Sequence, residues 1–343
     1  MQRRVVRAPP YRRRQMNEIR HLEVGTPVAT ALLLTDVQAR VRRDGSEMLR
    51  LKLADRTGSV DAVVLDGVAA ARDACQPGSV VFVCGTFSAD ERFGPRIVVE
   101  SLRAAAAHEY ERHQLVDGPA RPVALLETDL RELESTIQDP HLRELLALVL
   151  GPRTDTWARF RDAPAAKHYH QAYRGGLLEH SLTVAQAVSA ISATFGGIDR
   201  DVAVAGALLH DIGKLEAYEM VGDAIRMTDR GRLYGEIALG YYRVRRATEA
   251  IDGFPERLAE ALAHIILSHH GSLEHGSPVK PCTREATLVH MADSLGARMG
   301  SFDRIEKSLA PGQEWSSFDK GLGGGAYLPA AMPAPAPDER RAA

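Results

Sequence analysis

The sequence predicts two domains of different fold class, an N-terminal all-β barrel followed by a C-terminal all-α helical bundle. The chain of 343 residues is too long for one ordinary domain and long enough for two. Between residues 22 and 104, several short segments alternate apolar and polar side chains with a period of two. From about residue 123 to 305, apolar residues instead recur every three to four positions, as on the buried face of a helix.

The order of elements in residues 22–104 is that of an OB-fold, a five-stranded barrel with a helix between the third and fourth strands. Residues 49–53 alternate leucine with basic side chains, which is typical of a half-buried strand. The turn sequence of residues 55–58 then favours a hairpin. The expected elements are strands within 28–41, 49–53, 60–64, 79–87 and 95–102 and a helix at 68–75.

OB barrels commonly bind single-stranded nucleic acid on a face of basic and aromatic side chains. The candidate nucleic-acid contacts here are Arg50, Lys52, Phe93 and Arg96. Aromatic side chains are sparse in this region, so a barrel that contacts another protein remains an alternative.

Charge is distributed unevenly along the chain. The 43 basic and 45 acidic side chains give a net charge of −2, which by itself argues against a strongly basic nucleic-acid binder. Residues 1–105, however, carry 17 basic and 12 acidic side chains, and the rest of the chain carries 26 and 33. A basic half therefore precedes an acidic half, and a nucleic-acid partner is not excluded.

The two ends of the chain predict no packed structure. Residues 1–20 hold seven Arg against one Glu, and the C-terminal end is rich in Gly, Ala and Pro. No apolar run approaches the roughly 18 residues of a membrane span, and the three cysteines form no CxxC pair. We therefore expect a cytoplasmic protein with no membrane partner. Its predicted parts are a basic flexible arm at 1–21, an OB-fold nucleic-acid-binding domain at 22–104, a connector at 105–122, an all-α domain at 123–320 and a disordered tail at 321–343.

Histidines concentrate in the predicted helical half, where nine of the 13 lie between His168 and His290. Within that half, the adjacent His210 and Asp211 interrupt an apolar helix expected at 201–218. Burying such a pair costs free energy unless both side chains are satisfied, and a metal ion bound by imidazole and carboxylate does that. Lys214 follows one helical turn later, on the same side as His210, where it would neutralise phosphate charge.

Other predicted helices carry further candidate ligands. His180 follows the Gly175-Gly176 pair at the start of one helix, although a lone histidine on such an apolar stripe is more often a satisfied core residue. The remaining candidates are His269 and His270 at the end of a helix over 255–270 and Asp293 on a helix over 283–304. We expect His264 and His290 to have structural or supporting roles.

The order H…HD…HH…D over separate helices resembles the HD-domain metal-dependent phosphohydrolases. More narrowly, the chain is similar to the YhaM-type 3′-5′ exoribonucleases, which place an OB-fold before an HD domain. The resemblance covers roughly residues 22–320 and is strongest from 168 to 305. It is carried by HQAYRGGLLEHS (170–181), LLHDIGKLEAY (208–218), GRLYGEI (231–237) and ILSHHGSLEHGSPVKPCTREATLVHMADSLGARM (266–299).

The resemblance implies a set of ligands for two divalent cations. One cation would be held by His180, His210, Asp211 and Asp293, and Asp211 would bridge to a second cation held with His269 and His270. The family usually has a further histidine where this chain has Glu236, and a carboxylate also ligates Mn²⁺ or Mg²⁺. Smaller departures are Gln171, where a second histidine is usual, and Gly296, where an aspartate is often found. The expected cofactor is two divalent metal ions, with Mn²⁺ favoured and Mg²⁺, Co²⁺ or Fe²⁺ left open.

The expected function is a metal-dependent 3′-5′ exoribonuclease that releases nucleoside 5′-monophosphates from single-stranded RNA, with DNA left open. Asp211 and Lys214 are its expected catalytic residues, and a hydroxide activated by two cations is its expected nucleophile. One alternative is a small-nucleotide phosphohydrolase acting on dNTPs or cyclic dinucleotides, although no GYP follows His269-His270-Gly271. Another is a non-catalytic nucleic-acid-binding protein with a degenerate metal site. Homo-oligomerisation is left open.

Overall fold

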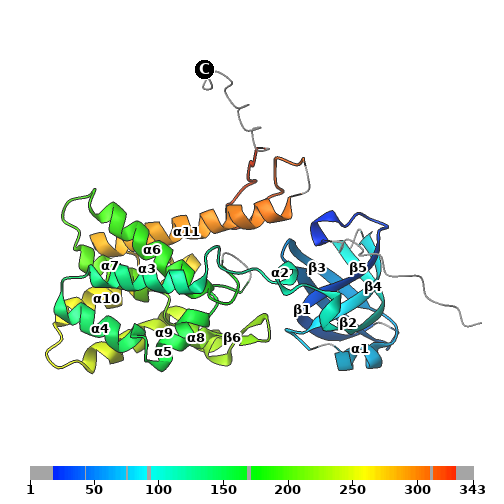
Figure 1. Cartoon of the computed structure of the whole chain (residues 1–343), viewed down its shortest axis with the longest axis horizontal. Helices are drawn as coiled ribbons and strands as arrows, with labels where there is room; N and C mark the ends of the chain where they lie inside the picture. The colour runs from blue at the N-terminus through cyan, green and yellow to red at the C-terminus, as the bar shows by residue number, and fades with distance from the viewer. Residues whose placement is uncertain are drawn as a thin grey trace, which may run out of the picture. The chain divides into compact units, whose positions relative to one another are not determined.

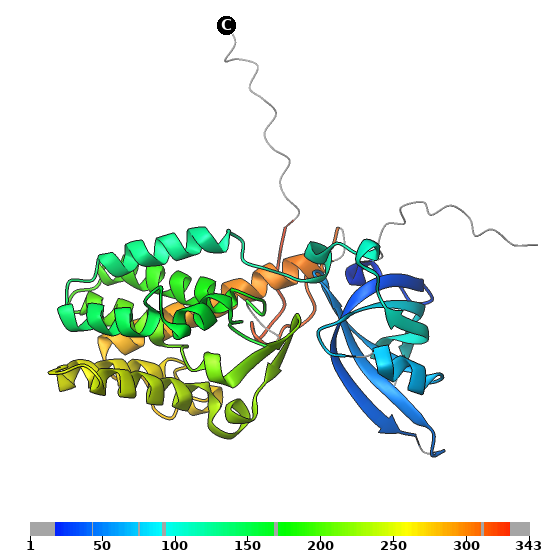
Figure 2. The ribbon, with the colours of Figure 1, turned by 60° about the horizontal axis from the view of Figure 1, so that its bottom comes forward.

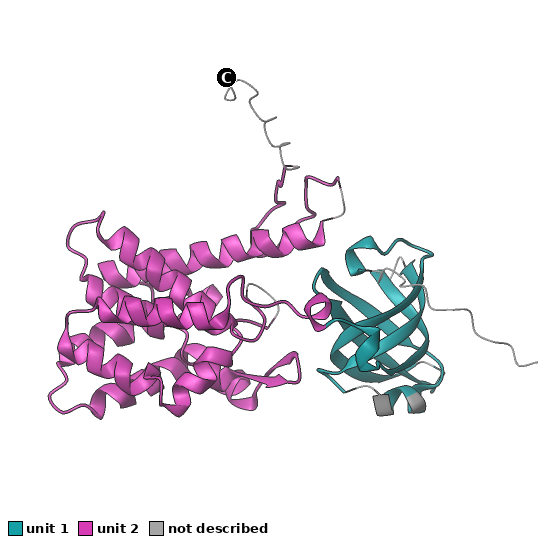
Figure 3. Cartoon of the chain, viewed as in Figure 1, with its two compact units in different colours: residues 1–111 teal, residues 112–343 magenta. Residues whose placement is uncertain are grey.

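The chain folds into two compact units, Met1–Glu111 and Arg112–Ala343, shown in different colours in Figure 3. The boundary falls inside the predicted connector. The computed structural model describes residues 18–42, 44–74, 76–90, 94–167, 171–309 and 312–329. Phe93, residues 1–17 of the predicted arm and the tail beyond residue 329 lie outside the described residues.

The first unit is a closed five-stranded barrel with the strand order β1-β2-β3-β5-β4. The β3–β5 pair is parallel and the other pairs are antiparallel. A helix lies between β3 and β4 in the chain, so the predicted OB-fold topology is confirmed (Figure 1). The elements are β1 (Pro27–Val41), β2 (Glu47–Asp55), β3 (Gly58–Val64), α1 (Val68–Ala74), β4 (Val80–Asp90) and β5 (Gly94–Ala104).

Period-two alternation places the apolar side chains of the strands inside the barrel. Leu49, Leu51 and Leu53 of β2 are buried, whereas Arg50 between them is exposed. Leu32, Val81 and Ile97 from three other strands complete the centre of this core and are at most 1% exposed. A one-residue slip of β2 would place its arginine in that core, so the pattern fixes the register.

The second unit is mainly helical (Figure 2). Its core is continuous, and α6 packs against α3, α5, α7 and α11. Side-chain caps explain several helix starts: Asp139, Thr154, Asp199 and Thr283 each accept a backbone N–H of the helix that follows. The helices are α2 (Arg112–Leu115), α3 (Val123–Ser135), α4 (Pro140–Leu150), α5 (Asp155–Asp162), α6 (Gly176–Ser192), α7 (Arg200–Leu209), α8 (Lys214–Ala217), α9 (Asp229–Glu249), α10 (Glu256–Ser268) and α11 (Arg284–Ser308).

The structure corrects the prediction of an all-α second domain. The helix expected at 201–218 ends at Leu209, where His210 and Asp211 begin a turn. The short α8 is followed by a two-stranded hairpin of β6 (Tyr218–Val221) and β7 (Ala224–Met227). Gly222 at φ 60° occupies the turn between the strands.

Two further features bear on the ends of helices in this unit. α9 is kinked at Gly235, whose φ of 74° and ψ of 155° are not helical, so Glu236 begins a new helical segment. After α11, residues 312–329 form turns with isolated bridges between Trp315 and Tyr327 and between Asp319 and Gly324. Part of this segment was expected to belong to the disordered tail from residue 321.

No helix in the described ranges combines the length and apolar character that crossing a membrane requires.

Candidate metal centre

The helical unit brings six of the predicted ligands together in its interior. They come from α6 (His180), the turn after α7 (His210 and Asp211), the end of α10 (His269 and His270) and α11 (Asp293). The apolar faces of α6, α7, α10 and α11 pack in the common core and so fix the positions of these ligands. His180, His210, Asp211 and His269 are at most 2% exposed, so ionisable side chains occupy a position where a buried group needs a partner.

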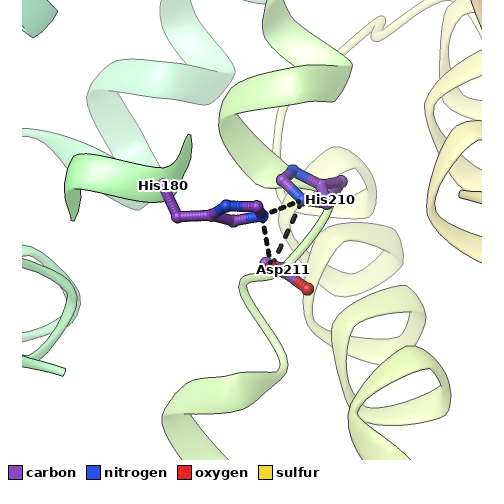
Figure 4. A group of neighbouring side chains, drawn as sticks. All are labelled: His180, His210 and Asp211. Carbon is purple, nitrogen blue, oxygen red and sulfur yellow. Dashed lines mark hydrogen bonds and ion pairs between the residues drawn. The ribbon is translucent and has the colours of Figure 1, made fainter. Parts of the chain in front are cut away.

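We define the His180 group by the ligand atoms that lie around His180 Nε2: His180 Nε2, His210 Nε2, Asp211 Oδ2 and Asp293 Oδ1. Asp293 also forms a group with His210 and His269, so neighbouring groups overlap. His180 Nε2 lies 3.1 Å from Asp293 Oδ1 and 3.2 Å from both Asp211 Oδ2 and His210 Nε2. His210 Nε2 lies 3.3 Å from Asp211 Oδ2 and 3.7 Å from Asp293 Oδ1. Figure 4 shows the contacts among His180, His210 and Asp211. Ligands about 2.0–2.2 Å from one cation lie about 3.0–3.5 Å from one another. Four of these five distances lie in that range, and the 3.7 Å between His210 and Asp293 is slightly longer.

Asp211 also takes part in a second group, the His269 group, with His269 and His270. Asp211 Oδ1 lies 3.6 Å from His269 Nε2. Both atoms are buried, and neither has a hydrogen-bond partner among the described residues. Two orphaned acceptor atoms that face each other are costly in a protein interior unless a cation lies between them. The two oxygens of Asp211 thus belong to different groups.

Hydrogen bonds at Nδ1 orient all four imidazole rings. The Nδ1 atoms of His210 and His269 are each 2.7 Å from the backbone carbonyls of Ala207 and Ile266. His270 Nδ1 is 2.8 Å from the carbonyl of His275. Donation from Nδ1 leaves the Nε2 lone pair available to a cation, which is the arrangement of metal-binding histidines. His180 has the same arrangement, with the side chain of Gln171 as acceptor at 3.1 Å.

The electrostatics of the protein alone favour positive charge at this site. Burial opposes the ionisation of Asp211, but Lys214 and His210 hold the pKa of its carboxyl group well below the usual range. Burial also lowers the pKa of His210, yet the carboxylates of Asp211 and Asp293 outweigh it and raise this pKa to about 10. The imidazole and carboxylate donors suit Mn²⁺, Fe²⁺, Co²⁺ or Zn²⁺, so the donor set fits a divalent cation.

The remaining predicted site residues lie beside these groups. Lys214 is buried with Nζ 2.6 Å from Asp211 Oδ2. Glu236 is half-buried and follows the kink of α9. Burial lowers the pKa of Lys214, but the negative charges of Asp211 and, to a smaller extent, of Glu236 outweigh burial and raise this pKa. Among the described residues, Glu236 does not belong to either group of ligand atoms. A Cβ atom at Gly213 would lie 1.9 Å from the carbonyl oxygen of Glu236, so this turn and α9 are in close backbone contact.

The structure also shows supporting contacts around the candidate ligands. His290 Nδ1 lies 2.7 Å from the carbonyl oxygen of His269 and thereby holds the turn after α10. Among the described residues, His264 belongs to neither group. It accepts a hydrogen bond from the backbone nitrogen of Cys282, which is 2.9 Å from His264 Nε2. Gln171 contacts His180 from nine residues earlier in the chain. The residue types alone do not predict this contact, because an amide at that separation is no signal of a metal site.

On the barrel, three of the four predicted nucleic-acid contacts share one outer face. Arg50 and Lys52 are two residues apart on β2 and therefore point the same way. Lys52 pairs across the strands with Asp61, and Asp61 pairs with Arg96. Lys52 Nζ lies 3.1 Å from Asp61 Oδ1, so an acidic side chain stands between the two basic ones. Phe93 lies outside the described residues.

Each unit contains a stretch that matches the model of a known family. Residues 177–298 match the HD domain family, and residues 34–105 match the OB-fold nucleic acid binding domain family. The chain is 29% identical to a protein named 3′-5′ exoribonuclease YhaM from Geobacillus sp. (strain WCH70), over 85% of this chain and 89% of the relative. It is 28% identical to the protein of the same name from Bacillus subtilis (strain 168), over 85% and 91%. The resemblance to the YhaM-type exoribonucleases is therefore confirmed across both units.

Two solved structures each align with about a quarter of the chain. The second OB-fold domain of replication protein A from Methanococcus maripaludis has a TM-score of 0.21 and 20% identity, over 25% of this chain and 91% of that one. The protein PriB from Ralstonia solanacearum has a TM-score of 0.21 and 14% identity, over 24% and 100%.

Proposed function

We propose that this protein is a metal-dependent 3′-5′ exoribonuclease that shortens single-stranded RNA from its 3′ end and releases nucleoside 5′-monophosphates. The HD domain and the curated relatives that align across both units support a hydrolytic 3′-5′ exonuclease. The observation that carries the metal-dependent mechanism is the pair of buried ligand groups that share Asp211. Single-stranded DNA is a further substrate to be tested.

Two divalent cations, with Mn²⁺ favoured, suit this pair of groups. His180, His210, Asp211 and Asp293 would hold one cation, and Asp211, His269 and His270 would hold the other. When bound, the cations would lower the pKa of the attacking water and stabilise the negative charge that develops on the phosphate oxygens.

Residues of the protein would set the positions of the cations and of the scissile phosphate. Asp211 directs one carboxylate oxygen to the His180 group and the other to the His269 group, so it would set the distance between two bound cations. The buried ammonium group of Lys214 adds a positive charge beside Asp211, where it would stabilise the charge of the scissile phosphate. The 3′ oxygen of the penultimate nucleotide would leave, and the products are a nucleoside 5′-monophosphate and an RNA shorter by one nucleotide.

The barrel would hold nucleotides upstream of the scissile bond. Arg50, Lys52 and Arg96 lie on one face, and basic side chains there would contact the sugar-phosphate backbone rather than base edges. Such contacts do not depend on base sequence and weaken as the salt concentration rises. We therefore expect the enzyme to degrade single strands of different sequence.

The proposal is tested with purified protein, Mn²⁺ and one RNA oligonucleotide labelled at either end. A 5′ label should give a ladder of products that shortens by one nucleotide, and a 3′ label should appear directly as a mononucleotide. Asp211→Asn should abolish the ladder, while Asp129→Asn, a carboxylate that pairs with Arg121 on the surface of the same unit, should preserve it.

Three other results would contradict the proposal. Hydrolysis of dNTPs or cyclic dinucleotides without hydrolysis of RNA would identify a small-nucleotide phosphohydrolase. Bound but intact RNA would identify a non-catalytic nucleic-acid-binding protein. A ladder that survives Asp211→Asn would place the catalytic centre elsewhere.

A further inference from the structure

We propose that Gln171 is a positioning residue that sets the orientation and tautomer of His180 and thereby the cation affinity of the His180 group. This inference rests on the proposed metal site. Gln171 lies in the loop before α6, at a position where the sequence departs from the family pattern that it resembles.

The contact between the two side chains has the geometry that metal binding requires. Gln171 Oε1 lies 3.1 Å from His180 Nδ1, on the opposite side of the ring from the candidate metal position. His180 Nε2 faces Asp211 Oδ2 and Asp293 Oδ1 at 3.2 and 3.1 Å. A histidine that binds a cation through Nε2 carries its hydrogen on Nδ1, and that hydrogen needs an acceptor. The amide oxygen of Gln171 is such an acceptor.

The backbone of Gln171 is held in an unusual conformation at this contact. Its φ of 51° is the only positive value of a non-glycine residue in the described part of the chain. Its carbonyl oxygen accepts the backbone N–H groups of Ala165, at 3.2 Å, and Tyr173, at 2.9 Å. The left-handed backbone conformation is unfavourable for residues other than glycine. Such a residue keeps it only where the surrounding structure imposes it, often at functional sites. Here it directs a polar side chain at a candidate ligand.

Gln171 also differs in kind from the acceptors of the other three histidines. His210, His269 and His270 place Nδ1 against backbone carbonyls, which substitution does not change. At His180 the acceptor belongs to a side chain, so this contact is accessible to mutation. A glutamine oxygen accepts a hydrogen bond at any pH, whereas a histidine at the same position would have to be neutral and in one tautomer to do so.

Two substitutions of similar length separate the hydrogen bond from the backbone conformation. Gln171→Met removes the acceptor and keeps an unbranched side chain, whereas Gln171→Glu keeps an acceptor. Both side chains have the same disadvantage in the left-handed backbone region. The matched control is Gln138→Met, an exposed glutamine whose amide contacts the carbonyl of Thr136, between α3 and α4. Circular dichroism and the thermal midpoint in EDTA establish that each variant is folded.

The readout is Mn²⁺ binding, measured by isothermal titration calorimetry and by the EPR signal of free Mn²⁺, without RNA. We expect Gln171→Met to weaken the affinity of one of two sites about 10- to 100-fold, as is usual when the partner of a metal-binding histidine is lost. Gln171→Glu should bind as tightly as the unmodified protein or more tightly, and Gln138→Met should bind unchanged.

Two results would overturn the inference: unchanged binding by Gln171→Met, or an equal loss in the Met and Glu variants, which would assign the effect to the backbone. Binding that follows the expected order in a protein that hydrolyses no RNA would support the role of Gln171 while contradicting the proposed function. The two proposals therefore fail separately.

Discussion

The ammonium nitrogen of Lys214 lies 2.6 Å from Asp211 Oδ2, in the interior of the helical unit. The same oxygen lies 3.2 Å from His180 Nε2 and 3.3 Å from His210 Nε2. Lys214 and a cation in the His180 group would therefore interact with one carboxylate oxygen, and their positive charges would repel each other. Lys214 should consequently oppose cation binding while it favours the reaction of a bound phosphate.

Replacing this lysine should separate the two effects. In Lys214→Met, we expect Mn²⁺ to bind about tenfold more tightly, because a competing positive charge is lost. The rate constant for RNA cleavage should fall about 100-fold, because a charge that stabilises the transition state is also lost. Calorimetry and single-turnover kinetics measure the two quantities.

Lys307→Met serves as the control for that experiment, since Lys307 Nζ lies 2.6 Å from Asp117 Oδ2 with both side chains exposed. It should change neither quantity. A Lys214→Met protein with unchanged Mn²⁺ affinity and unchanged cleavage rate would remove Lys214 from the catalytic centre.

Replacing Asp61 tests the proposed binding face of the barrel through a substitution that should strengthen RNA binding. Its carboxylate lies 3.1 Å from Lys52 Nζ and pairs across the strands with Arg96. Asp61→Asn should tighten the binding of single-stranded RNA about three- to tenfold and steepen the salt dependence by about one phosphate contact. Fluorescence anisotropy in EDTA at several salt concentrations measures both without hydrolysis.

Glu47→Gln provides the matched control on the same barrel, because Glu47 also pairs with a basic side chain, Arg72 of α1. Glu47 begins β2 but lies three positions from Arg50, so it points to the other side of the strand. Glu47→Gln should leave RNA binding unchanged if the face that carries Arg50, Lys52 and Arg96 is the binding face. Equal tightening by both substitutions would indicate a general effect of net charge and argue against that face.

Glu236 stands where the family usually has a histidine, and it lies beside Lys214 without joining either ligand group. If it ligates the second cation, Glu236→His should retain cleavage and shift the preferred metal from Mn²⁺ and Mg²⁺ towards Co²⁺ and Zn²⁺, because imidazole is the softer donor. Activity profiles across these four metals measure the shift. An unchanged profile would show that Glu236 is not a ligand.

Metal removal should destabilise the helical unit more than the barrel. A ligand that binds only the folded state at 100 times its Kd stabilises that state by about 2.7 kcal/mol. Mn²⁺ should therefore raise the thermal midpoint of the chelated protein by several degrees, and Asp211→Asn should abolish most of this increase. Differential scanning calorimetry measures both effects. An equal increase in the unmodified and Asp211→Asn proteins would indicate that Mn²⁺ stabilises the chain at other positions.

The sequence revealed the elements whose physical signal is local. Strand β2 was recognisable because leucines alternate with basic residues, and the candidate ligands were recognisable because His210 and Asp211 are improbable in an apolar segment without a partner. The β6–β7 hairpin was missed although Gly222-Asp223 separates two short apolar runs, because the neighbouring helical pattern was extended through it.

Other features of the site could not be read from residue types. The acceptors of His210, His269 and His270 are backbone carbonyls, which every residue possesses and only the fold selects. The kink of α9 is similar, since glycine permits a φ of 74° at Gly235 without requiring it. Such hydrogen bonds and kinks depend on contacts between distant parts of the chain, which a local sequence pattern does not predict.

The close approach at Gly213 gives a diagnostic for distant homologues. A Cβ atom at position 213 would lie 1.9 Å from the carbonyl oxygen of Glu236 and 2.4 Å from the backbone nitrogen of Gly240. Any side chain at this position would therefore collide with the backbone of α9. A homologue with a larger residue here must carry α9 farther from the His-Asp turn. The residue at position 213 thus indicates how closely the backbone at position 236 can approach the turn that carries His210 and Asp211.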